Sequence, residues 1–161
     1  MDLSILLIGI GSVAVFIVPI YFLQRGNTRE EVNKQKSFKK LAEQNGVTVS
    51  KFDLWNENGI GLDQNKKKLF VTNTLNEKAV SSTIDLTDFA LCKLVNDSRT
   101  VKTKHNKTTV VERITLNLKP ANSTQTETAI VFYDKNGNTS LNNEFMLAES
   151  WEKLLNGILS R

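Results

Sequence analysis

The chain has 161 residues, 40% of them hydrophobic, and it carries 21 basic and 17 acidic side chains for a net charge of +4. This mild basic excess, without a basic face interleaved with aromatic residues, argues against nucleic-acid binding. The single cysteine excludes an internal disulfide, so an oxidising compartment is not implied.

The first predicted element is the uncharged stretch Leu3 to Leu23, which is rich in Ile, Leu, Val and Phe. It is long enough to cross a bilayer, since roughly 20 apolar residues at about 1.5 Å each span a core of roughly 30 Å. A cleaved secretory signal would have a basic start, a shorter apolar run and a small-x-small cleavage site, and a buried core helix would need cover on every side. The sequence therefore predicts a transmembrane anchor over residues 1–24.

The flanks of this stretch predict its orientation. Only Asp2 precedes it, whereas basic residues follow it at Arg25, Arg29, Lys34, Lys36, Lys39 and Lys40. Basic residues close to a span stay on the cytoplasmic side. Four Asn-x-Ser/Thr triplets point the other way, but a chain so rich in Asn, Ser and Thr contains them by composition. We therefore expect a single-pass protein of the cell membrane whose C-terminal domain is cytoplasmic.

A juxtamembrane segment, residues 25–46, carries a helix signal. Thr28 and Glu31 have the spacing of a capping box, and Gly46 is suited to end the helix. A thin apolar face indicates a helix over Arg29 to Asn45 that packs on the following domain as its first element. A stalk, a helix on lipid headgroups and a partner-binding helix are the alternatives.

From Val47 the apolar period changes from helical to alternating, which predicts short strands. They are expected within 47–54, 60–63, 68–73, 79–86, 89–95, 108–118 and 126–133, with polar loops at 96–106, 120–125 and 134–138. Six or seven short strands with close turns predict an antiparallel sheet that curls into a barrel or sandwich.

The last predicted element is an amphipathic helix. Asn142 or Asn143 is suited to cap it, and its apolar stripe comprises Leu147, Ala148, Trp151, Leu154, Leu155 and Ile158. Such a stripe must be buried, and the open end or face of a curled sheet is the expected place. Residues 47–161 are thus predicted to form one α+β domain.

Three phrases carry a resemblance to a known fold family: Asn58-Gly59-Ile60-Gly61-Leu62-Asp63 before the lysines 66–68, Thr83-Ile84-Asp85-Leu86-Thr87-Asp88, and the helix around Trp151. Together they resemble the pleckstrin-homology-like (PH-like) domain of small bacterial single-pass membrane proteins of unassigned function. The resemblance implies a hairpin that turns at the Lys-rich tip and a further strand after the Ile-Asp-Leu phrase. A fold by itself implies no function.

No motif predicts catalysis. His105 lies in a polar loop and Cys92 in a predicted strand, and no sequence motif joins either to a carboxylate. Their number is too small for a metal site. The stretch 134–138 has some features of a calcium loop, but the position of the bidentate Glu falls on Phe145, so a hairpin turn is the better interpretation. We expect no catalytic residue, cofactor, metal or small-molecule substrate.

Two basic tips are the candidate contacts for an anion or a partner: Lys66, Lys67 and Lys68 in one turn, and Lys102, Lys104 and Lys107 in the long loop. If both project from one end of the domain, they would hold an anionic headgroup or an acidic partner segment.

The sequence thus predicts a membrane-anchored, non-enzymatic binding or scaffold domain at the cytoplasmic face, with the bilayer and a protein as partners. The alternatives are a sensor of anionic lipid headgroups and, less favoured, an enzyme without a readable motif. An exposed sheet edge is a further binding mode, but the sequence does not show which edge is free.

Overall fold

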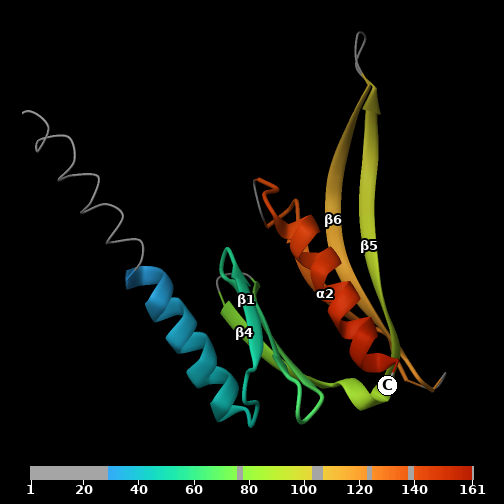
Figure 1. Ribbon diagram of the computed structural model, residues 1–161. Helices are drawn as coiled ribbons and strands as arrows, with labels where there is room; N and C mark the ends of the chain where they lie inside the picture. The colour runs from blue at the N-terminus through green and yellow to red at the C-terminus, as the bar shows by residue number, and fades with distance from the viewer. Residues whose placement is uncertain (1–28, 76–77, 103–106, 123–124, 138–139, 161) are drawn as a thin grey trace, which may run out of the picture. The chain divides into compact units, whose positions relative to one another are not determined.

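The computed structural model describes residues 29–75, 78–102, 107–122, 125–137 and 140–160, with the side chains of 74–75, 78–79, 101–102 and 107–108 left out (Figure 1). The chain divides into two compact units between Leu41 and Ala42. The described part of the first unit is helical, and this helix runs over residues 29–44, close to the predicted range.

The helix ends at Gly46 by the mechanism that the sequence predicts. Gly46 has φ +77°, a conformation that glycine adopts without a steric cost. Its N–H donates to Glu43 O at 2.9 Å, and the N–H of Val47 donates to Ala42 O at 3.0 Å. This pair of bonds satisfies the last carbonyls of the helix. Thr28, the predicted N-terminal cap, lies outside the described residues.

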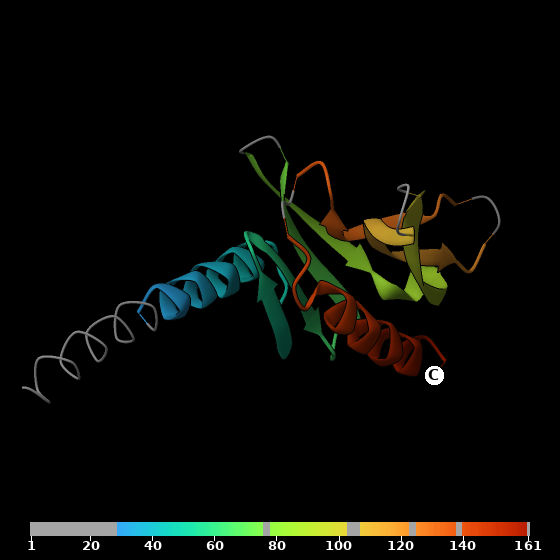
Figure 2. The same cartoon turned by 90° about the horizontal axis from the view of Figure 1, so that it is seen from above.

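The described residues of the second unit form seven strands and a C-terminal helix (Figures 1 and 2). The strands are β1 (Lys51–Trp55), β2 (Asn58–Asp63), β3 (Lys68–Leu75), β4 (Lys78–Asp85), β5 (Phe89–Lys102), β6 (Lys107–Pro120) and β7 (Thr128–Asp134). The helix is α2 (Glu144–Leu159), and a short 3-10 helix, η1 (Leu86–Asp88), lies between β4 and β5. The unit is therefore α+β.

The strands form two antiparallel sheets, one in the order β1-β2-β3-β4 and the other in the order β5-β6-β7. Both sheets and α2 contribute to one hydrophobic core, because apolar side chains on alternate strand positions face inward. Its fully buried members include Ile60 and Leu69 of the first sheet, Leu116 and Phe132 of the second, and Trp151 of α2.

Trp55 links the two sheets. Its ring stacks on that of Phe132 with a centroid distance of 4.5 Å and an interplanar angle of 1°. Its Nε1 also donates a hydrogen bond to Phe132 O at 2.9 Å. An indole buried in this way has both its apolar face and its polar N–H satisfied. The end of β1 is thereby fixed against β7.

The predicted fold, a transmembrane helix followed by one curled antiparallel sheet or barrel, needs correction, although the antiparallel strands and the C-terminal helix agree with it. No helix in the described residues is long and apolar enough to cross a membrane. The strands form two separate sheets of four and three strands, because η1 interrupts the chain after β4 and β5 then starts a new sheet. Leu86 in η1 is buried, which holds this break in place. The stretch from Leu3 to Leu23 lies outside the described residues.

A second difference concerns the predicted loop at 96–106. Residues 96–102 continue β5, and they pair with β6 through Thr100 opposite Thr109 to Lys102 opposite Lys107. The prediction failed here because these residues are polar and lack the alternation of a half-buried strand. Cross-strand pairing with β6 extends this part of the hairpin beyond the core, against which Val111 of β6 still packs.

Candidate binding edge of the β5–β6 hairpin

The β5–β6 hairpin has two parts with different surroundings. The inner part, residues 89–95 and 113–120, belongs to the three-stranded sheet, which ends where Arg113 pairs with Asp134 of β7. We call residues 96–102 and 107–112 the outer ribbon. Here β5 and β6 have only each other as strand partners, and the side chains of residues 96–100 are exposed. Figure 1 shows β5 and β6 continuing side by side past the N-terminal end of α2.

In the inner part, α2 covers the edge of β5. The side-chain amide of Asn156 accepts from Cys92 N at 2.8 Å and donates to Cys92 O at 2.8 Å. Glu152 Oε1 accepts from Leu94 N at 2.7 Å. Uncovered edge strands are templates for pairing with other chains. These two side chains take the place of a neighbouring strand and close this length of edge.

In the outer ribbon, both edges are free of strand partners among the described residues. In an antiparallel ladder, successive residues direct their backbone groups to opposite sides. Because Cys92 and Leu94 bond to α2, the even-numbered residues of β5 face away from β6, which places the N–H and C=O of Ser98 and Thr100 at the free edge. Thr109 lies opposite Thr100 and presents its own N–H and C=O at the free edge of β6.

A turn ends β7 beside β6. Asn136 N donates to Asp134 Oδ1 at 2.9 Å, and Gly137 N donates to Asp134 O at 3.0 Å. Lys135 N then makes the last bond to β6, at 2.9 Å from Glu112 O. The stretch 134–137 is thus a turn, but it is not the predicted hairpin turn, because β7 is followed by α2 and not by another strand.

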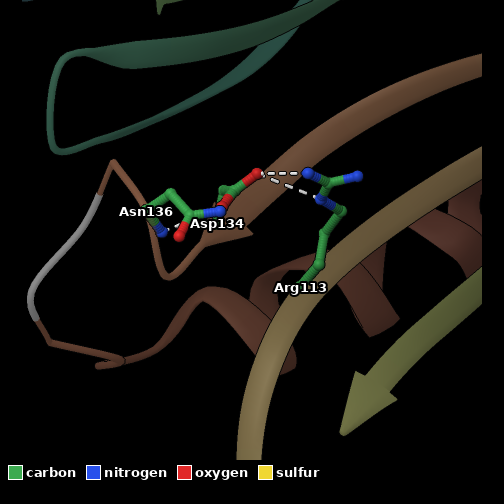
Figure 3. A network of polar contacts seen from close by, with 3 residues as sticks. All are labelled: Arg113, Asp134 and Asn136. Carbon is green, nitrogen blue, oxygen red and sulfur yellow. Dashed lines mark hydrogen bonds and ion pairs between the residues drawn. The ribbon is translucent and has the colours of Figure 1, made fainter.

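Charged side chains surround this point. Arg113 donates to Asp134 Oδ2 from Nη2 at 2.6 Å and from Nε at 3.0 Å (Figure 3). Arg99 Nε lies 3.0 Å from Glu112 Oε1. The backbone hydrogen bond from Asn136, and then Arg113, hold the pKa of Asp134 below its usual value.

These pairs line an open hollow of about 460 Å³ at the end of β7. Its lining residues are Asp97, Arg99, Glu112, Arg113, Asp134, Lys135 and Asn136. With three acidic and three basic side chains, the hollow is balanced in charge. Such a lining suits a polar segment that carries both signs of charge, and it does not favour a polyanion.

The lysines of the β2–β3 turn lie beside carboxylates. Lys66 donates from Nζ to Gly46 O at 3.0 Å and from its backbone N to Asp63 Oδ1 at 3.0 Å. Asp63 is buried, and the backbone hydrogen bond from Lys66 is the main reason that its pKa is lowered. Lys68 pairs in register with Asp85. The charges of Lys66 and Lys68 also help to lower the pKa of Asp63 and of Asp85, so part of the positive charge predicted for an external anion acts on carboxylates within the domain.

The two predicted groups of lysines are not brought together. Leu86 N donates to Lys67 O at 2.8 Å, so the β2–β3 turn lies near the start of β5, whereas Lys102 ends that strand. A strand of 14 residues spans about 45 Å at roughly 3.3 Å per residue. Lys102 and Lys107 face each other at the end of the outer ribbon, their side chains are not described, and Lys104 lies outside the described residues.

The described residues offer little reactive chemistry. Cys92 is buried, and burial together with the charge of Glu152 raises the pKa of its thiol to about 12. His105 lies outside the described residues. No group of three His, Cys, Asp or Glu side chains within the described ranges is placed to hold a metal ion. The geometry supports recognition by polar contacts.

No protein-family model, no curated protein and no solved structure matches this chain. The resemblance to PH-like membrane proteins therefore stays a prediction.

Sequence reasoning did not single out Arg99, Arg113 or Asp134 as neighbours, although one signal was present. The adjacent charges Glu112 and Arg113 break the alternation of β6, and the register shifts at this point. Such a break marks a β-bulge, which often terminates pairing or redirects a side chain.

Proposed function

We propose that this chain is a non-enzymatic binding domain that takes up an extended segment of a protein partner as an added strand on the free edge of β6. The observation that carries the proposal is that residues 107–112 of β6 extend beyond Arg113, where pairing with β7 stops. In this mode of recognition, main-chain hydrogen bonds supply affinity and side chains on alternate positions supply specificity.

The charged hollow supports this placement. An added strand would continue the line of β7 along β6, and it would begin where Lys135 N makes the last bond to Glu112 O. Its first side chains would meet Arg99 and Glu112, both of which are partly exposed. Charged contacts of this kind fix register and exclude wrong partners more than they add affinity. The partner segment is therefore expected to carry both an acidic and a basic residue.

A position at the cytoplasmic face of the cell membrane stays a prediction from the sequence. The lipid-headgroup alternative has less support, since Lys66 and Lys68 lie beside Asp63 and Asp85. Binding of the full chain to anionic vesicles that is abolished by neutralising Lys66, Lys67 and Lys68 would favour that alternative over the one proposed here.

The test begins with a photo-cross-linking amino acid at Thr109 in the full chain, expressed in its own cells. Thr83 of β4, which is also an exposed strand residue, is the matched control position. We expect a discrete adduct with a partner protein from Thr109 and none from Thr83, and mass spectrometry then identifies the partner. Equal labelling from both positions, or none from Thr109, would contradict the proposal.

Proline substitutions then test the edge itself. Thr109→Pro removes the N–H that faces the added strand, so we expect at least about a tenfold loss of affinity for the identified partner. Thr100→Pro, on the opposite edge of the same ribbon, is expected to change that affinity less than about twofold. Retention of full affinity by Thr109→Pro would show that the partner binds elsewhere.

A further inference from the structure

The free edge of β5, residues 96–100, is self-complementary in sequence. When two such edges are placed antiparallel about Ser98, Ser98 of one copy faces Ser98 of the other, and Asp97 faces Arg99. We propose that a second copy of this chain pairs with this edge, so that the two three-stranded sheets join into one sheet of six strands about a two-fold axis at Ser98.

The backbone of β5 fits this register. Asn96, Ser98 and Thr100 direct their N–H and C=O groups away from β6, because they continue the alternation fixed at Cys92 and Leu94. The register about Ser98 sets Asn96 opposite Thr100 of the second copy and Ser98 opposite Ser98. All of the outward backbone groups from 96 to 100 are then hydrogen-bonded across the axis.

The side chains favour the same register. Asp97 and Arg99 fall at non-hydrogen-bonded positions, where opposite side chains lie closest. Within the described residues the Asp97 carboxylate has no hydrogen bond or ion pair, and the Arg99 side chain, 63% exposed, approaches Glu112 through Nε at 3.0 Å. A guanidinium has five N–H donors, so this exposed side chain can pair with the carboxylate of the second copy as well as with Glu112. The two-fold axis forms this ion pair twice.

Neighbouring registers are excluded by charge. The next registers that still pair the outward backbone groups place Asp97 opposite Asp97, or Arg99 opposite Arg99. Like charges directly opposite each other on a sheet are destabilising. On the other side, the bond from Leu94 N to Glu152 ends the free edge, which limits the contact to residues 96–100. The antiparallel register of two copies about Ser98 therefore both pairs the outward backbone groups and places opposite charges against each other.

Disulfide cross-linking is the first test. Opposite residues at a hydrogen-bonded position have Cα atoms about 5.5 Å apart, within the range of disulfides. The full chain carrying Ser98→Cys is therefore expected to form a covalent dimer on mild oxidation, at least about tenfold faster than Thr109→Cys, an exposed position on β6 of the same ribbon. The native Cys92 is buried and contributes little background. Equal rates for the two variants would contradict the pairing.

A charge exchange is the decisive test, measured as the dimer dissociation constant of the full chain in mild detergent. Asp97→Arg alone and Arg99→Asp alone each place like charges in contact, so each should raise the dissociation constant by more than about tenfold. The double variant restores opposite charges across the axis and should return to within about threefold of the unmodified chain. A double variant as weak as the single ones, or an unmodified chain that remains monomeric, would overturn the proposal.

Two proline variants separate this dimer from the proposed partner site. Thr100→Pro removes an N–H of the β5 edge and should weaken only the dimer, whereas Thr109→Pro should weaken only partner binding. A dimer disrupted by Thr109→Pro and not by Thr100→Pro would place the second copy on β6 and would contradict this inference.

Discussion

The inner and outer parts of the β5–β6 hairpin consist of the same two strands and differ in what covers them. The inner part packs under α2 and beside β7, and Leu116 and Leu118 are fully buried there. In the outer ribbon Asn96 to Thr100 are polar and exposed, and Val111 packs against the border of the core. β5 and β6 pair in both parts, with a register shift between Asp97 and Ser98, so pairing defines the strands while burial determines how strongly each part is held.

The two parts of the hairpin also differ in whether the edge of β5 is covered. Asn156 and Glu152 close the edge of the inner part with side chains from α2. No equivalent cover reaches the outer ribbon within the described residues, and the charges there fit the register of a second strand. A protein that closes one length of edge and leaves the next open is suited to pairing at the open length.

The largest expected effect is a difference in stability between two substitutions in β6, one in the inner part and one in the outer ribbon. Leu116→Ala in the inner part removes a fully buried side chain and should lower the free energy of unfolding by about 2 to 5 kcal/mol. Val110→Ala in the outer ribbon should lower it by no more than about 0.5 kcal/mol, because Val110 is only half-buried. Urea denaturation of both variants checks this. Equal losses would show that the outer ribbon belongs to the core.

The second test opens the closed edge. Asn156→Ala leaves Cys92 N and Cys92 O without their partners and should cost about 1 to 3 kcal/mol of unfolding free energy. Lys153→Ala on the same helix removes only an exposed pair with Glu149 and should cost less than about 0.5 kcal/mol. Hydrogen exchange at Cys92 should rise in the first variant and not in the second. Unchanged exchange would mean that Asn156 does not protect the strand.

A third test applies pH to a turn outside the hairpin. Asp63 accepts from Thr48 N and Lys66 N, each at 3.0 Å, so Asp63→Asn should cost about 1 kcal/mol at pH 7. The folded pKa of Asp63 is lowered, so its contribution is complete above the unfolded value of about 3.9 and is lost as pH falls through the folded value. The stability gap between the two proteins should therefore close in acid. If the difference in unfolding free energy between the two proteins does not change with pH, the loss does not come from the charge of Asp63.

The smallest effect is expected at the junction of the two parts. The pair between Arg113 and Asp134 is partly exposed, with side-chain exposures of 50% and 26%. Arg113→Ala should therefore change stability by less than about 1 kcal/mol, and the change should shrink in high salt. A larger, salt-independent loss in thermal unfolding would show that this pair anchors the end of β7.

The same comparison explains what the sequence could predict. The helix around Trp151 and the strand around Leu116 were predictable, because burial imposes a period on their residues. The extension of β5 to Lys102 was not, since residues 96–100 are all polar and have the composition of a loop. The break between the two sheets at η1 also escaped prediction, and so did the contact of Trp55 with Phe132 that links them, because these residues are far apart in the chain.

For the candidate site, the sequence predicted a type of contact and not its position. The sequence indicated binding through loops or an edge, and the structure shows which edges are free within the described residues. The lysines were chosen by charge alone, but the ammonium group of Lys66 donates to Gly46 O, and its charge also lowers the pKa of Asp63. The helix start differed in a similar way: Asn143 makes no capping bond, and Glu144 accepts from Asn142 N and Asn56 Nδ2 instead.

The cover that α2 provides for β5 has a consequence for biosynthesis. In chain order α2 follows all seven strands, so β5 leaves the ribosome before Asn156 and Glu152 exist to cover it. During that interval the whole length of β5 is open to neighbouring nascent chains. A delay in translation between β7 and α2, or premature termination there, should therefore yield chains that aggregate through β5. Synthesis of α2 is the step that protects this edge from pairing with other chains.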